Sequence, residues 1–150
     1  MSQAVKEKQS IIEEARKLYL KEGYSCSESV ILSLRDAGLE VPDAILRSVT
    51  GLRAGIGGSG CVCGVLMAAV LLVGYYYGRT SNKEDEKKAN KLSAELHDLF
   101  KQQFKSTCCR VLTRKHDFKS RERKEFCAGI IEFLIPEILS RLPQETDYQI

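Results

Sequence analysis

Residues 56–78 contain no charged side chain, and this constrains the fold more than any other feature of the sequence. The segment starts in a glycine-rich stretch, GIGGSGCVCG, and continues as a firmly apolar run from Val62 to Tyr77. That run is shorter than the roughly 20 residues that a membrane-spanning helix needs. A helix that is apolar on all sides also suits the centre of a soluble bundle, whose other helices must bury their own apolar faces. We therefore expect a buried central helix and no membrane span, with a membrane helix as the alternative.

The other helical segments are amphipathic. Apolar residues recur at helical spacing in residues 11–19, 30–37 and 92–104, with charged residues between them. No segment shows the alternation typical of a strand, and no internal repeat is visible. These patterns predict an all-α fold with a single domain over residues 1–150. Its architecture is expected to be a helical bundle of about five to seven helices around the central apolar helix.

Capping motifs indicate where several of these helices begin. Residues 25–28 (SCSE) and 81–84 (SNKE) both match the S-x-x-E pattern of a capping box. The second match predicts the start of a charged helix. We expect the last helix to begin near Ser120, and Pro136 to kink it or to divide it from residues 137–142.

The glycine-rich stretch also contains the pattern G-x-G-x-x-G, at residues 55–60. This pattern binds a dinucleotide only where it connects a strand to a helix, because the glycines must bring backbone N–H groups against the pyrophosphate. The preceding segment, PDAILRSVTGL, has a helical pattern. A nucleotide site is therefore disfavoured, and we expect the glycines to permit close approach of other parts of the protein.

The charge balance argues against nucleic acid as a partner. The chain has 23 basic and 20 acidic residues, and its net charge is only +3. A basic run at residues 114–124 is interrupted by two acidic residues, so we expect it to be a solvated loop and helix face. His97 and His116 are expected at the surface. No catalytic triad, zinc-protease or P-loop motif supports a hydrolase or an NTPase.

How the cysteines are interpreted depends on the redox state of the compartment. The segment MSQAVKEKQSIIEEARKL is charged throughout and shows no secretory signal, which predicts a cytoplasmic, reducing location. In such a compartment, clustered cysteines are more often metal ligands or redox groups than a disulfide framework. The chain has six cysteines, which are therefore candidates for a functional site.

Most of the cysteines stand at predicted helix starts: Cys26, Cys61, Cys63, Cys108 and Cys109. Free backbone N–H groups and the helix dipole stabilise a thiolate at such positions. We expect these donors to lower the pKa of Cys63, so that it reacts before Cys127, which lies inside the last helix. The alternative is that the cysteines only fill the core, since free cysteine buries well.

Four of these positions are similar to a known pattern. Cys26 in YSCSESV matches its first cysteine, and residues 63–68 (CGVLMA) match its central element, CGAxxG. Cys109 in FKSTCCRVLT matches the third cysteine, and Cys127 falls where the fourth is expected. Over roughly residues 10–140, the chain resembles the C_GCAxxG_C_C family of redox-active proteins.

The chain departs from the family pattern in two respects. Val65 and Ala68 stand where the family has alanine and glycine, which leaves less room beside the helix. Cys61 and Cys108 are additional to the four cysteines of the pattern, and they are alternative ligands or reactive groups.

The resemblance implies a redox or metal role for one site, with the ligands Cys26, Cys63, Cys109 and Cys127. Four thiolates suit an iron–sulfur cluster for electron transfer or a tetrahedral zinc. A metal-free thiol–disulfide protein is the alternative, with Cys63 or Cys109 as the attacking thiol. A zinc-stabilised or non-catalytic interaction module is the third reading. The sequence leaves open the redox partner, whether the protein is an enzyme, and the oligomeric state, a homo-oligomer included.

Overall fold

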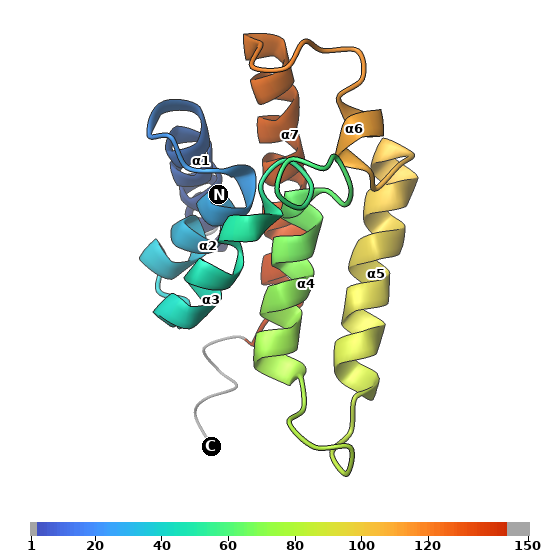
Figure 1. The fold of residues 1–150 in the computed structure, drawn as a ribbon. Helices are drawn as coiled ribbons and strands as arrows, with labels where there is room; N and C mark the ends of the chain where they lie inside the picture. The colour runs from blue at the N-terminus through green and yellow to red at the C-terminus, as the bar shows by residue number, and fades with distance from the viewer. Residues whose placement is uncertain (1–2, 144–150) are drawn as a thin grey trace.

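The computed structural model describes residues 3–143, and this part of the chain is helical with no strand (Figure 1). The long helices are α1 (Gln3–Lys21), α2 (Cys26–Asp36), α4 (Gly64–Tyr77), α5 (Lys87–Phe104) and α7 (Arg121–Leu139). The short elements are α3 (Asp43–Ser48), the 3-10 helix η1 (Thr50–Leu52) and α6 (Cys109–Leu112). The predicted all-α bundle is confirmed.

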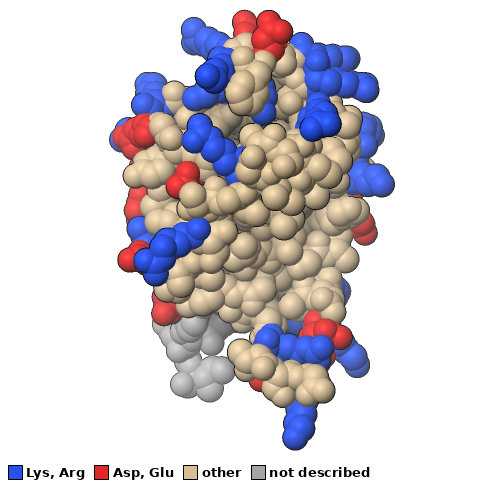
Figure 2. Space-filling model, viewed as in Figure 1, with Lys and Arg blue, Asp and Glu red and all other residues tan. Residues whose placement is uncertain are grey.

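Helix α4 lies in the middle of the bundle and contacts α2, α5 and α7 (Figure 1). The side chains of Leu66, Leu72 and Val73 are buried in the shared core, as expected of a central helix. The helix is not covered on all sides, because Tyr75 is 40% exposed. Figure 2 shows a broad surface without charge over this part of the molecule. Within residues 3–143, no helix is both long enough and apolar enough to cross a membrane.

Two of the predicted helix starts are confirmed by their capping hydrogen bonds. At α2, the Ser25 hydroxyl accepts from the backbone N–H of Glu28 at 3.3 Å, and the Glu28 carboxylate accepts from the N–H of Ser25 at 3.0 Å. At α7, the Ser120 hydroxyl accepts from the N–H of Arg123 at 3.1 Å. Helix α7 continues through Pro136 to Leu139, so the proline does not divide it.

The predicted start of the charged helix α5 is wrong by several residues. Residues 81–84 form a turn instead, in which the N–H of Glu84 donates to the Ser81 carbonyl at 3.1 Å. The Arg79 guanidinium holds this turn by donating to the Glu84 carbonyl at 3.1 Å. The Asp85 carboxylate then accepts from the N–H of Lys87 at 2.8 Å, and α5 begins there. The side-chain contact at the helix start therefore comes from an aspartate four residues after the predicted serine, and the N-cap residue Glu86 makes no side-chain capping bond.

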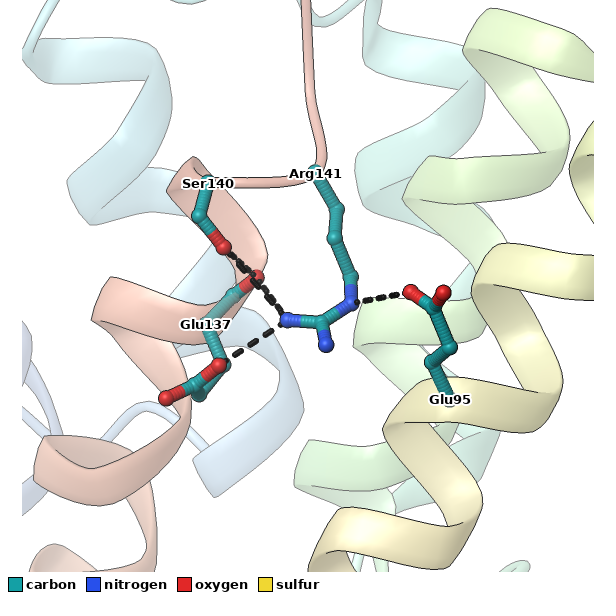
Figure 3. A network of polar contacts seen from close by, with 4 residues as sticks. All are labelled: Glu95, Glu137, Ser140 and Arg141. Carbon is teal, nitrogen blue, oxygen red and sulfur yellow. Dashed lines mark hydrogen bonds and ion pairs between the residues drawn. The ribbon is translucent and has the colours of Figure 1, made fainter.

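An arginine joins α5 to the C-terminal end of α7 (Figure 3). Arg141 donates from Nε to the Glu95 carboxylate at 3.1 Å and from Nη1 to the Glu137 carboxylate at 2.9 Å. The same Nη1 also donates to the Glu137 carbonyl at 3.0 Å. The contact thus joins the middle of α5 to the residues that follow the C-terminal end of α7, whereas α6 lies near the N-terminal end of α7 (Figure 1).

Candidate thiol site

The glycine-rich loop before α4 folds back on itself and does not form a dinucleotide motif. It is closed by backbone hydrogen bonds, among them Gly57 N–H to the Gly51 carbonyl at 2.8 Å and Gly60 N–H to the Ala54 carbonyl at 3.1 Å. Both Gly57 and Gly60 have positive φ, which glycine adopts without a steric penalty. Helical segments, not a strand, precede the loop, so the context that a nucleotide site needs is missing.

Two glycines at this loop make room for cysteines from other helices. A Cβ atom on Gly64 would lie 3.2 Å from the sulfur of Cys26 and 2.7 Å from the Leu52 carbonyl oxygen. A Cβ atom on Gly55 would lie 3.0 Å from the Cβ of Cys109. The glycines therefore let α2 and α6 approach the start of α4, as the sequence predicted for them.

The structure brings the four pattern cysteines to this end of the bundle. Cys26 begins α2, Cys63 precedes α4, Cys109 begins α6, and Cys127 lies inside α7. Cys63 and Cys109 are buried, with 5% and 8% of their surface exposed, and the other two are half-buried.

The pKa of Cys26 depends on the charge of the other three thiols. Burial is the main cause that raises the pKa of Cys26. Negative charge on the other three thiols raises that pKa further, with Cys63 contributing most, then Cys127 and then Cys109. Ionising one thiol of the group therefore makes it harder to ionise Cys26.

The expectation that the helix start lowers the pKa of Cys63 is wrong in sign. Burial raises the pKa of Cys63 to about 12 and outweighs every other contribution. The backbone N–H groups of Leu66 and Val65 do act in the predicted direction and lower it. They do not compensate because the thiol is almost completely removed from water.

Cys127 has a polar partner that the sequence did not indicate. The Tyr19 hydroxyl interacts with its sulfur. Burial raises the pKa of Cys127, while the positive charge of Arg123 and the interaction with Tyr19 lower it. Burial, followed by negative charge on the neighbouring thiols, raises the pKa of Tyr19, so this hydroxyl stays a donor.

The four cysteines of the family pattern were also predicted to hold a metal. Among the side chains in the described part of the chain, no three of His, Cys, Asp and Glu are placed to hold a metal ion. The iron–sulfur cluster and the zinc therefore stay predictions.

A basic pocket opens on one side of Cys109. It is a cavity of about 230 Å³ between the glycine loop, α6 and the start of α7. The residues that line it are Ala54, Gly58, Gly60, Cys109, Arg110, Thr113, Arg114, His116, Phe118 and Arg123. These include three arginines and no carboxylate, and Figure 2 shows Lys and Arg gathered toward this end of the molecule. The Arg123 guanidinium donates to the Cys109 sulfur at 3.7 Å.

The comparison with protein families agrees with this arrangement. A family model described as "Putative redox-active protein (C_GCAxxG_C_C)" matches residues 24–139. The chain belongs to the C_GCAxxG_C_C family. Neither the curated proteins nor the solved structures compared with the chain contain a match.

As a member of the C_GCAxxG_C_C family, the chain carries two cysteines beyond the four of the pattern. Cys61 is exposed, Cys108 is half-buried, and their sulfur atoms lie 2.8 Å apart. The hydrogen bond between the two thiols is the largest cause that raises the pKa of Cys61, and Arg110 lowers it. These two cysteines thus form a separate pair on the surface, next to the four thiols of the family pattern.

The arginines of the pocket are the functional candidates that the sequence did not reveal. The run at residues 114–124 was expected to be a solvated face, yet Arg114 and Arg123 line the cavity beside Cys109. The available signal was the position of this run, directly after the cysteine pair at 108–109. His116 also lines the cavity, with its ring 5.5 Å from that of Phe126, while His97 is exposed as expected.

Proposed function

We propose that this chain is a thiol-based redox protein in which Cys109 meets the substrate and a buried cysteine completes the reaction. One observation carries this proposal: Cys109 lines the arginine pocket and is also electrostatically coupled to the interior thiols Cys26 and Cys63. Membership of a redox-active family supports the same chemistry.

The pocket favours a small anionic substrate. Arg110, Arg114 and Arg123 supply positive charge on its wall, and no acidic side chain opposes them. Guanidinium groups bind carboxylates through paired hydrogen bonds. A low-molecular-weight disulfide that carries carboxylates therefore fits both the charge and the chemistry of the site.

The reaction is thiol–disulfide exchange in two steps. The Cys109 thiolate attacks one sulfur of the substrate disulfide, the substrate S–S bond breaks, and one substrate thiolate leaves. A neighbouring cysteine such as Cys63 loses its proton and attacks the Cys109 sulfur, which releases the second substrate thiolate. Two protein thiols become one disulfide, one substrate disulfide becomes two thiols, and the two protons move to the leaving groups.

A metal-bound form is the second candidate. It is favoured by the fact that the cysteines of the family pattern come from four different helix regions and lie near one another. Thiolates at Cys26, Cys63, Cys109 and Cys127 would supply the ligands for an iron–sulfur cluster or zinc, which would add electron transfer or structural support. Visible absorption and metal analysis of protein purified without oxygen would separate the two, since the thiol protein is expected to be colourless and metal-free.

The thiol proposal can be tested with two disulfide probes of different charge. The protein used in the test is the C61S/C108S variant, so that the surface pair Cys61 and Cys108 cannot react. Its rate of reaction is measured with 5,5′-dithiobis(2-nitrobenzoate), which carries two carboxylates, and with uncharged 4,4′-dithiodipyridine. We expect Cys109→Ser to remove the fast reaction with both probes.

Charge variants test the role of the pocket. Arg114→Gln should slow the anionic probe roughly two- to fivefold and leave the neutral probe nearly unchanged, since one cation contributes about 0.5–1 kcal/mol at a partly exposed site. Lys83→Gln is the matched control, because it removes one cation from an exposed turn outside the pocket. A fast phase that survives Cys109→Ser would overturn the proposed role of this thiol. Equal slowing of both probes would overturn the anionic substrate.

A further inference from the structure

The two cysteines outside the family pattern are placed for chemistry of their own. The sulfur atoms of Cys61 and Cys108 lie 2.8 Å apart although the residues are 47 positions apart in the chain. A disulfide bond is about 2.0 Å long. The sulfurs therefore need to approach by less than about 1 Å to form one.

The backbone on both sides fixes this placement. The N–H of Cys63 donates to the Thr107 carbonyl at 2.8 Å, and the N–H of Arg110 donates to the Gly60 carbonyl at 2.8 Å. The two bonds pair residues 60–63 with residues 107–110 in opposite directions, and the cysteine pair lies between them. The Arg110 guanidinium adds a third contact by donating to the Ser59 carbonyl at 3.0 Å. The thiols are thus held together by the fold around them.

The pair also differs from the interior thiols in its access to solvent. Cys61 is exposed and Cys108 is half-buried, whereas Cys63 and Cys109 are buried. A soluble reagent can reach Cys61 without any opening of the bundle. Packing does not explain a cysteine at an exposed loop position, because the usual structural use of free cysteine is in the core.

We propose that Cys61 and Cys108 form a second redox site, a surface dithiol that closes to a disulfide by exchange with small soluble disulfides of the glutathione class. One cysteine thiolate attacks a sulfur of the soluble disulfide, whose S–S bond breaks and releases one thiolate. The second cysteine loses its proton and attacks the mixed disulfide, releasing the other thiolate. Two protein thiols are oxidised, and one disulfide is reduced to two thiols that take up the two protons.

Closing this disulfide would join two walls of the basic pocket. Gly58 and Gly60 line the pocket from the glycine loop, and Cys109 and Arg110 line it from α6. The proposed bond connects these two segments covalently. The surface pair therefore sets how far the pocket can open, while its own oxidation needs no reaction at Cys109.

The test uses trypsin fragments. Cleavage after Lys and Arg places Cys61 and Cys63 in one peptide, residues 54–79, and Cys108 and Cys109 in another, residues 106–110. In C63S/C109S, each peptide keeps one cysteine, and a link between them reports only the pair Cys61 and Cys108. The variant is equilibrated in glutathione buffers, quenched with acid, alkylated and analysed by mass spectrometry. We expect to find the two peptides linked. In native protein, half of the link should persist at a ratio of reduced to oxidised glutathione at least about tenfold higher than in 6 M urea, because the fold raises the effective concentration of one thiol at the other.

C61S/C108S is the matched control, since a link between the same peptides then reports Cys63 and Cys109 and tests the interior site independently. In case C63S/C109S does not fold, a brief maleimide pulse on the wild-type chain, followed by digestion and sequencing of the labelled peptides, reports the labelling of Cys61 and Cys108 before and after oxidation. Both thiols should be labelled before oxidation and neither after it. The proposal is overturned if folded C63S/C109S gives only glutathione adducts, if native protein and urea give the same midpoint, or if oxidation leaves the labelling of Cys61 and Cys108 unchanged.

Discussion

Gly64 is the residue on which the close approach of η1 and α2 to the start of α4 depends. A Cβ atom there would lie 2.7 Å from the Leu52 carbonyl oxygen, which belongs to the backbone and cannot rotate away. We expect Gly64→Ala to lower the free energy of unfolding by about 1–3 kcal/mol, as measured by urea denaturation. Gly74→Ala is the control in the same helix, because no heavy atom lies within 4 Å of its added Cβ. That control should be neutral or stabilising by up to about 1 kcal/mol, and equal losses in both variants would contradict the steric argument.

Reactivity at the cysteines follows exposure more than position on a helix. Burial raises the pKa of Cys63 to about 12, while Cys61 is exposed two residues earlier. In reduced native protein at pH 8, iodoacetamide should modify Cys61 at least about tenfold faster than Cys63. The two rates should become similar in 6 M urea. If Cys63 reacts first in the native protein, the backbone donors at the start of α4 outweigh its burial after all.

At the level of elements, one carboxylate bonds to the first residue of α5. Asp85 accepts from the N–H of Lys87 at 2.8 Å. Asp85→Ala should therefore lower the free energy of unfolding by about 0.5–1.5 kcal/mol, the usual net contribution of one hydrogen bond. Ser81→Ala tests the start that the sequence suggested. It should change the free energy of unfolding by less than about 0.5 kcal/mol, and a larger loss there than at Asp85 would contradict the observed helix start.

Helix starts were predicted correctly where the residues that form the sequence pattern also make the hydrogen bonds that begin the helix. At Ser25 and Ser120, the hydroxyl accepts a hydrogen bond from the backbone N–H three residues later, so the predicted helix start and the observed interaction coincide. At residues 81–84 the same pattern formed a turn, because Arg79 holds the Glu84 carbonyl from outside the motif. The pocket was not predictable for a related reason: Arg123 reaches Cys109 only after the loop between α6 and α7 has folded back.

The electrostatics of the thiols was not predictable from the sequence. The resemblance named four cysteines, and negative charge on three of them raises the pKa of the fourth, Cys26. The sign of the pKa shift at Cys63 depends on how completely neighbouring helices remove water from the sulfur. That quantity is a property of the packed core, and a helix start in the sequence says nothing about it.

For the whole molecule, buried thiols make stability depend on pH. The pKa of Cys63 is raised from an ordinary value of 9.0 to about 12, so between these values the folded chain keeps a proton that the unfolded chain loses. The unfolded state then binds fewer protons, and the free energy of unfolding must fall as pH rises. Each such thiol contributes a slope of up to about 1.4 kcal/mol per pH unit. Burial shifts the pKa of Cys26 in the same direction and adds to the loss.

Urea denaturation of reduced protein between pH 6 and 10.5 measures this slope, with Cys63→Ala as the variant that lacks one titrating thiol. Its stability should fall less steeply with pH than that of the wild-type chain. A metal centre predicts the opposite sign at lower pH, because ligating thiolates must be deprotonated and metal binding then stabilises the fold as pH rises. Stability that is flat from pH 6 to 8 and falls above 9 therefore supports protonated thiols in the resting protein. Stability that rises from pH 6 to 8 and is lost with a chelator would support the metal site instead.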